Sequence, residues 1–206
     1  RDGLCGTCIK TRLGRFRAAT EREMDSYFSG ETGKIIFMKL GIISDTHDQV
    51  TRIEQAIVLF NRERVSKVYH LGDWCSPFSV ELFGALHCPV IGIFGNNDGD
   101  LYKMVTRKPS NVEFKDRFFV DMVDDMRIAL IHGDPKEVAH DLYTSKQYDL
   151  ILCGHTHVAK IERNEKTLLI NSGNLIGPFS DKTEWTPPSI AIHDTETNDA
   201  RIINLE

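Results

Sequence analysis

The chain has 206 residues, enough to bury the core of one domain without disulfide or metal staples. Apolar residues make up 41% and charged residues 27%, and no apolar run reaches the roughly 18 residues that a membrane span needs. Residues 1–37 contain seven Lys/Arg and five Asp/Glu residues, so the rest of the chain contains 18 Lys/Arg and 25 Asp/Glu residues. An acidic chain without a Lys/Arg cluster argues against a binder of duplex nucleic acid.

Residues 1–37 differ from the rest because they lack strand patterning. We interpret them as an N-terminal extension of unknown role before a domain over 38–206; a transit peptide is the alternative. Cys5 and Cys8 have the spacing of half a zinc site or of a redox pair, but no second pair supports either. Five scattered cysteines, an odd number, disfavour a disulfide framework and favour the reducing cytoplasm.

From residue 38 onward, strand-like and helix-like segments alternate. Helices are predicted over 50–64, near 78–86, near 100–107 and near 135–146. Strands are predicted over 39–44, 66–71, 89–94, 111–114, 117–123, 127–132, 148–153, 158–163, 166–171, 189–194 and 200–205. The first half is βαβ-like and the second mainly β, which predicts an α/β fold of two packed mixed sheets flanked by helices.

Metal-ligand residue types recur where these strands end. The clusters are Asp45-Thr46-His47, Gly72-Asp73, Gly95-Asn96-Asn97-Asp98, His132-Gly133 and Gly154-His155-Thr156-His157. Each alone is most simply a turn residue, a helix cap or a core histidine. Five in series at strand ends predict one metal site assembled from distant segments. If the strand continues through Asp45 and His47, both side chains project to the same side, and His155 and His157 repeat that spacing.

This series resembles the calcineurin-like metallophosphoesterases, and within them the small one-domain, YfcE-like phosphodiesterase branch. The resemblance covers about residues 38–206 and implies a four-layer metallophosphoesterase-type sandwich. It implies a first metal on Asp45, His47 and His157, a second on Asn96, His132 and His155, and Asp73 as the bridge.

The implied activity is hydrolysis of a small phosphate ester, preferably a phosphodiester, by hydroxide that two divalent cations activate. Imidazole-rich ligand sets suit transition metals, so Mn²⁺ is expected first, with Ni²⁺, Fe²⁺, Co²⁺ and Zn²⁺ as alternatives. Asp73, Asn96, Asn97 and Asp98 are the expected catalytic residues. Asp98 either orients a ligand histidine or caps a turn.

Two motifs depart from the family pattern. Many members have His where Asn97 stands, and an amide cannot protonate a leaving group. The segment Asn171-Ser172-Gly173-Asn174 resembles the family's Asn-Pro-Gly-Ser with Pro and Ser replaced. In the following loop, Phe179 and Trp185 either stack on a nucleobase or belong to a lid or an interface.

Two alternative functions have the same fold. One is a protein-binding scaffold of the retromer-subunit type that retains metal, which the complete ligand set disfavours. The other is a phosphomonoesterase, which differs only in substrate. The oligomeric state is left open, and Leu82, Phe83 and the loop 172–188 are the candidate interface residues for a homo-oligomer. Cys75 and Cys153 are expected to be small buried hydrophobes, and His70, His87, His140 and His193 to be core or surface residues.

Overall fold

The computed structural model describes residues 37–177 and 187–206. The Cys5 and Cys8 pair, nearly all of the predicted extension, and the loop aromatics Phe179 and Trp185 lie outside these described residues.

The described strands form two mixed sheets. The six-stranded sheet has the order β11-β10-β1-β2-β3-β4. Its strands are β1 (Lys39–Ile43), β2 (Lys67–His70), β3 (Val90–Gly92), β4 (Val112–Phe114), β10 (Ser189–Asp194) and β11 (Asp199–Asn204). β1 to β4 run parallel, whereas β10 pairs antiparallel with both β1 and β11.

The five-stranded sheet has the order β5-β6-β7-β9-β8. Its strands are β5 (Phe118–Val123), β6 (Met126–Ile131), β7 (Leu150–Cys153), β8 (Lys160–Arg163) and β9 (Leu168–Asn171). β6, β7 and β9 run parallel, and the predicted hairpin joins β8 to β9 in antiparallel pairing.

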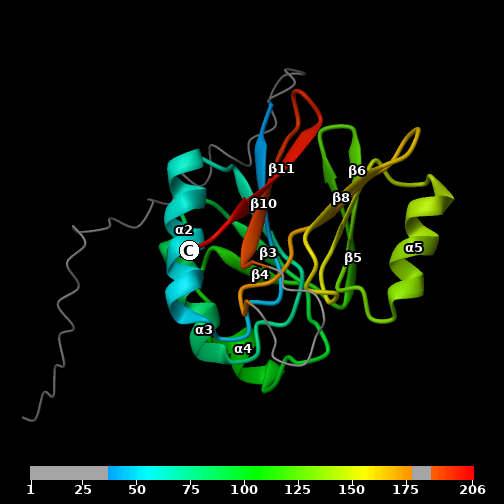
Figure 1. Cartoon of the computed structure of the whole chain (residues 1–206). Coiled ribbons are helices and arrows are strands. Elements are labelled where there is room, and N and C mark those ends of the chain that lie inside the picture. The colour runs from blue at the N-terminus through cyan, green and yellow to red at the C-terminus, as the bar shows by residue number, and fades with distance from the viewer. Residues whose placement is uncertain (1–36, 178–186) are drawn as a thin grey trace, which may run out of the picture.

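Helices cover the outer faces of both sheets. They are α2 (Val50–Glu63), α3 (Pro77–Leu82), the 3₁₀ helix η1 (Phe83–Ala85), α4 (Leu101–Arg107) and α5 (Lys136–Ser145). The predicted stripe on α2 is confirmed, because Ile53, Ala56, Ile57 and Phe60 are all buried. Figure 1 shows α2 on the side of the six-stranded sheet and α5 on that of the five-stranded sheet.

Three separate apolar clusters fill the spaces between these layers. One joins α2, α3 and α4 to the six-stranded sheet, one lies between the two sheets, and one lies beneath α5. In β1 the alternation is direct, since Leu40 and Ile42 join the cluster between the sheets and Ile43 joins the one under α2. Three clusters between four layers confirm the predicted sandwich.

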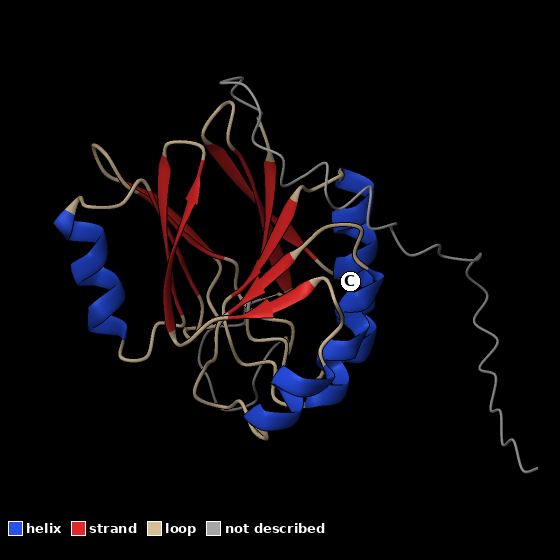
Figure 2. Cartoon of the chain, turned by 180° about the vertical axis from the view of Figure 1, so that it is seen from behind, coloured by secondary structure: helices blue, strands red, loops and turns tan. Residues whose placement is uncertain are grey.

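The topology brings the candidate ligands together. β1, β2 and β3 are parallel, so their carboxyl ends lie at one edge, and those of β6 and β7 do likewise in the other sheet. Figure 2 shows the strands of both sheets converging on loops at one end of the molecule. The loops that carry the five motifs follow these strands.

The expectation that Phe83 contributes to an interface was wrong. Phe83 is fully buried, with its ring centroid 4.9 Å from that of Trp74, because η1 turns this side chain into the core. Leu82 is half-buried and packs against the same cluster. Neither residue forms an exposed apolar patch. Among the described residues, no helix combines the length and apolar character that crossing a membrane requires.

His193 on β10 is a buried histidine whose ring nitrogen Nε2 lies 3.0 Å from Asn198 Oδ1. Burial lowers its pKa below the ordinary 6.5, although Asn198 and Asp194 oppose the shift. Below pH 6.5 the unfolded chain therefore binds a proton that the folded chain excludes. This contribution to stability is present above pH 6.5 and is lost as the pH falls.

We therefore expect His193→Gln to reduce the loss of stability between pH 7 and pH 5.5. Urea unfolding at several pH values measures this slope for the wild type and the variant. His87→Gln, at an exposed histidine, is the control and should keep the wild-type slope. A His193→Gln protein with an unchanged slope would contradict the assignment.

Candidate metal centre

The ligand loops begin sooner than the sequence suggested. β1 ends at Ile43, and the backbone at Asp45 and His47 has φ angles of 51° and 41°. His155 and His157 have φ angles of 65° and 60°. The strand therefore does not continue through either pair, and the condition for the two side chains of each pair to project together along a strand is not met. Successive left-handed turns, rather than a strand pleat, place both members of each pair at the site.

Backbone hydrogen bonds fix these loops to one another. The amide of Asp45 donates to the Gly72 carbonyl at 3.0 Å, and that of His47 donates to the Asp73 carbonyl at 3.1 Å. In the other sheet the Gly154 amide donates to the His132 carbonyl at 2.9 Å. The loops after neighbouring strands are thus joined by main-chain contacts, which offset the cost of the unusual φ angles.

One group of candidate ligands comprises Asp45, His47, Asp73 and His157. One donor atom from each lies within 4.8 Å of all the others. His157 Nε2 lies 3.2 Å from Asp45 Oδ1, and His47 Nε2 lies 3.4 Å from Asp73 Oδ2. Both carboxylates are buried and both imidazoles are half-buried.

A second group comprises Asn96, His132 and His155. The side-chain oxygen of Asn96 lies 3.0 Å from His132 Nε2 and 3.0 Å from His155 Nδ1. His132 Nδ1 lies 2.7 Å from the Leu71 carbonyl, which can only accept, so Nδ1 carries a proton and Nε2 is the nitrogen that faces the site.

Asp73 lies between the two groups. Its Oδ2 faces His47 at 3.4 Å, and its Oδ1 lies 3.5 Å from His132 Nε2. One carboxylate therefore presents a separate oxygen to each group, an arrangement that suits a ligand shared by two cations.

The donor chemistry suits divalent cations. Asp45 Oδ1 and His47 Nε2 are buried and have no hydrogen-bond partner within the described part of the chain. Unsatisfied buried polar atoms are costly, and a cation bound to both would satisfy them. The combination of imidazole, carboxylate and amide oxygen fits borderline transition metals.

Neighbouring histidines stabilise the ionised forms of the two buried carboxylates. Burial opposes ionisation of Asp45, but contacts with His157 and His47 lower its pKa overall. Burial likewise opposes ionisation of Asp73, and His132 and Asn97 lower its pKa. Burial disfavours a charged His47, yet Asp45 and Cys75 raise its pKa to about 10. The carboxylates are therefore anionic at neutral pH.

Ser44, which the sequence did not single out, and residues of two predicted motifs orient the ligands. The Ser44 hydroxyl donates to Asp45 Oδ2 at 2.6 Å, and the His155 amide donates to the same oxygen at 2.9 Å. Both bonds leave Asp45 Oδ1 facing the cluster. Asn174 donates from Nδ2 to the His157 carbonyl at 2.9 Å, and Asn171 donates to the Gly154 carbonyl at 2.8 Å. The altered Asn-Ser-Gly-Asn segment therefore supports the histidine loop.

The alternatives left open for Asp98 are resolved by its partners. Its carboxylate accepts from the backbone amides of Gly95 at 2.7 Å, Cys75 at 2.9 Å and Asp73 at 3.1 Å. It caps the loop that carries Asp73, and the hydrogen bonds found for it in the described region involve no histidine. Asn97 donates to Asp73 through its backbone amide at 2.8 Å and its side chain at 2.7 Å.

The histidines outside the motifs lie in the core or at the surface, as expected. His70 is fully buried and stacks on Trp74 at 3.4 Å between ring centroids. Its Nδ1 accepts from the Gly72 amide, so Nε2 carries the proton toward Thr46 Oγ1 at 3.1 Å. Cys153 is buried, whereas Cys75 is only half-buried and contacts His47, which corrects the expectation of a buried hydrophobe.

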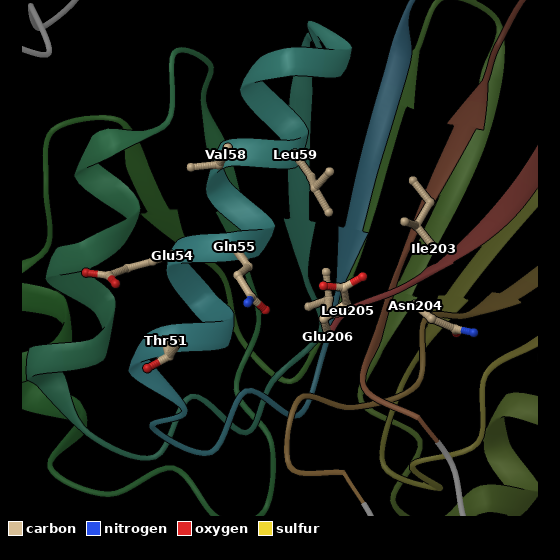
Figure 3. Close-up of a pocket in the computed structure, with 9 residues that line it drawn as sticks. All are labelled: Thr51, Glu54, Gln55, Val58, Leu59, Ile203, Asn204, Leu205 and Glu206. Atoms are coloured by element: carbon tan, nitrogen blue, oxygen red, sulfur yellow. The ribbon is translucent and has the colours of Figure 1, made fainter. Parts of the chain in front are cut away.

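A separate groove of about 500 Å³ lies between α2 and the end of β11 (Figure 3). Val58, Leu59, Ile203 and Leu205 contribute its apolar surface. None of the predicted ligands lines this groove, so it is not part of the candidate centre.

Comparison with known proteins agrees with this geometry. The profile of the calcineurin-like phosphoesterase superfamily domain matches residues 38–198. Phosphodiesterase MJ0936 of Methanocaldococcus jannaschii is 37% identical over 171 residues, which cover 82% of this chain and all of that protein. The solved structure of an archaeal phosphodiesterase has a TM-score of 0.73 and 35% identity, again over 82% of this chain and all of that one.

Vacuolar protein sorting 29 from Cryptosporidium parvum has a TM-score of 0.60 and 20% identity, over 82% of this chain and 92% of that one. At this identity the likeness concerns the fold alone.

Proposed function

Because the chain belongs to the calcineurin-like phosphoesterase superfamily, we propose that it hydrolyses phosphodiesters with two divalent cations held by the loops at the carboxyl ends of its strands. The observation that carries this proposal is the position of Asp73, which presents one oxygen to His47 and the other to His132. The name of the Methanocaldococcus relative supports phosphodiesters over monoesters as the substrate class.

In this proposal Asp45, His47 and His157 hold the first cation, and Asn96, His132 and His155 hold the second. Asp73 contacts both. The two clusters of donor atoms, and the two unsatisfied buried atoms in the first cluster, support this division. Mn²⁺ is the cation we expect first, since the carboxylate and amide oxygens suit it, and the imidazoles keep Ni²⁺, Fe²⁺, Co²⁺ and Zn²⁺ as alternatives.

When bound, two such cations supply positive charge for the phosphate and lower the pKa of water enough to provide a nucleophile near neutral pH. The chain's own residues hold and orient the site. Ser44 and the His155 amide fix Asp45, and the Leu71 carbonyl fixes the tautomer of His132. The three free cysteines of the described residues agree with a cytoplasmic enzyme.

Asn97 stands where many relatives carry histidine, and it donates to Asp73 rather than offering an acidic proton. The leaving group must then depart without general-acid assistance, which elsewhere contributes about 10²–10⁴-fold. We expect the rate to depend steeply on leaving-group pKa across a series of aryl phosphodiesters. Asn97→His should flatten this dependence. A flat dependence in the wild type would contradict the assignment.

The proposal is tested by measuring kcat/KM for a matched aryl phosphodiester and monoester, with Mn²⁺ and with EDTA. We expect Mn²⁺-dependent hydrolysis with the diester preferred. Preference for the monoester would make the protein a phosphomonoesterase. No turnover of either ester by metal-loaded protein would favour a scaffold.

A further inference from the structure

The two ring nitrogens of His47 face different surroundings. Nε2 faces the carboxylates, 3.4 Å from Asp73 Oδ2 and 3.8 Å from Asp45 Oδ1. Nδ1 faces the opposite way and lies 3.3 Å from the sulfur of Cys75, within hydrogen-bond distance for sulfur. A histidine that binds a cation through Nε2 must carry its proton on Nδ1, and that proton needs an acceptor.

The backbone holds Cys75 in the position that this contact requires. Its φ angle is 76°, in the left-handed region that a non-glycine residue rarely adopts. Its amide donates to Asp98 Oδ1 at 2.9 Å, and its carbonyl accepts from the Gly99 amide at 3.2 Å. Because the chain is fixed on both sides, the sulfur is directed at His47 rather than into the core.

His132 differs from His47 in the group that its Nδ1 contacts. The Nδ1 of His132 lies 2.7 Å from the backbone carbonyl oxygen of Leu71. Carbonyls and carboxylates are the common partners of metal-binding histidines, whereas sulfur is a weaker acceptor. The Nδ1 atoms of His47 and His132 therefore meet different partners, and the partner of His47 is a side chain, which can be substituted without changing the backbone.

We propose that Cys75 is a positioning residue for His47. Its sulfur accepts the Nδ1–H bond and so keeps the Nε2 lone pair directed at the first cation site. This inference rests on the proposed metal centre. Losing such a partner elsewhere weakens metal affinity about 10–100-fold.

The test is calorimetric titration with Zn²⁺ of metal-free wild type, Cys75→Ala and Cys75→Ser. We expect Cys75→Ala to weaken one of two sites about 10–100-fold and to leave the other unchanged. Cys75→Ser should restore most of the affinity, because its hydroxyl also accepts. Cys88→Ala is the control, since Cys88 is buried in the core beneath the helices and away from the ligands.

A second readout separates the hydrogen bond from general packing. In the Zn²⁺-loaded protein, the His47 Nδ1–H should give a slowly exchanging proton signal in the NMR spectrum of the wild type and of Cys75→Ser. That signal should be lost in Cys75→Ala.

Three results would overturn the inference. The first is Cys75→Ala binding two Zn²⁺ ions as the wild type does, and the second is Cys75→Ser binding as weakly as Cys75→Ala. Both would leave the metal centre intact. The third is a wild-type protein that binds no Zn²⁺, which would overturn the metal centre together with the role of Cys75.

Discussion

Replacing Asp73 by Asn lowers kcat/KM for a phosphodiester by more than about 100-fold, because losing a group outside the ligand shell already costs about 10–100-fold. The substitution changes little in shape but removes the charge shared by the two groups of ligands. It also replaces one of the oxygens that face His47 and His132 with an amide nitrogen. We expect binding of both cations to weaken together, which calorimetric titration with Mn²⁺ measures beside the rate.

The matched control is Asp116→Asn, which makes the same charge change at an exposed position. It should keep both the rate and the cation affinities. Asp73→Asn with a wild-type rate would show that the carboxylate is not shared between two cations.

Replacing Gly95 by Ala is expected to be nearly as damaging. A Cβ atom at this position would lie 2.2 Å from Asp73 Oδ1 and 2.6 Å from the Asp73 amide nitrogen, so the carboxylate or its backbone must move. A displacement of about 1 Å in a catalytic group can cost about 10²-fold in rate. We also expect a loss of about 1–3 kcal/mol in the free energy of unfolding, as for other overpacked sites.

Gly99 is the control in the same loop. A Cβ atom there would meet nothing closer than the Cys75 carbonyl oxygen at 3.7 Å, an ordinary contact. Gly99→Ala should therefore keep the activity and the urea midpoint of the wild type. Equal loss in both variants would mean that the loop is sensitive to any added methyl group, rather than to the contact with Asp73.

The layers of the fold could be predicted because local patterns determine them. Helical spacing from Ile53 to Phe60 identifies the buried face of α2, and apolar runs such as Leu150–Cys153 identify buried strands. The predicted elements therefore agree with the observed ones to within a few residues at their ends. Candidate ligands could be chosen because parallel strands place their carboxyl ends at one edge.

What surrounds the ligands could not be predicted in this way. The contact of Cys75 with His47 joins positions 28 residues apart, and that of the His155 amide with Asp45 joins positions 110 apart. No periodicity or spacing encodes such partners, since they arise only when loops from different strands meet. Contacts between loops also fix the left-handed backbone at Asp45 and His47, whose amides donate to the carbonyls of Gly72 and Asp73.

The most direct test of the two-cation centre is anomalous diffraction from crystals of the protein grown with Mn²⁺. We expect two peaks, one beside Asp45, His47 and His157 and the other beside Asn96, His132 and His155, with the Asp73 carboxylate between them. A single peak, or two peaks that do not share Asp73, would contradict the account.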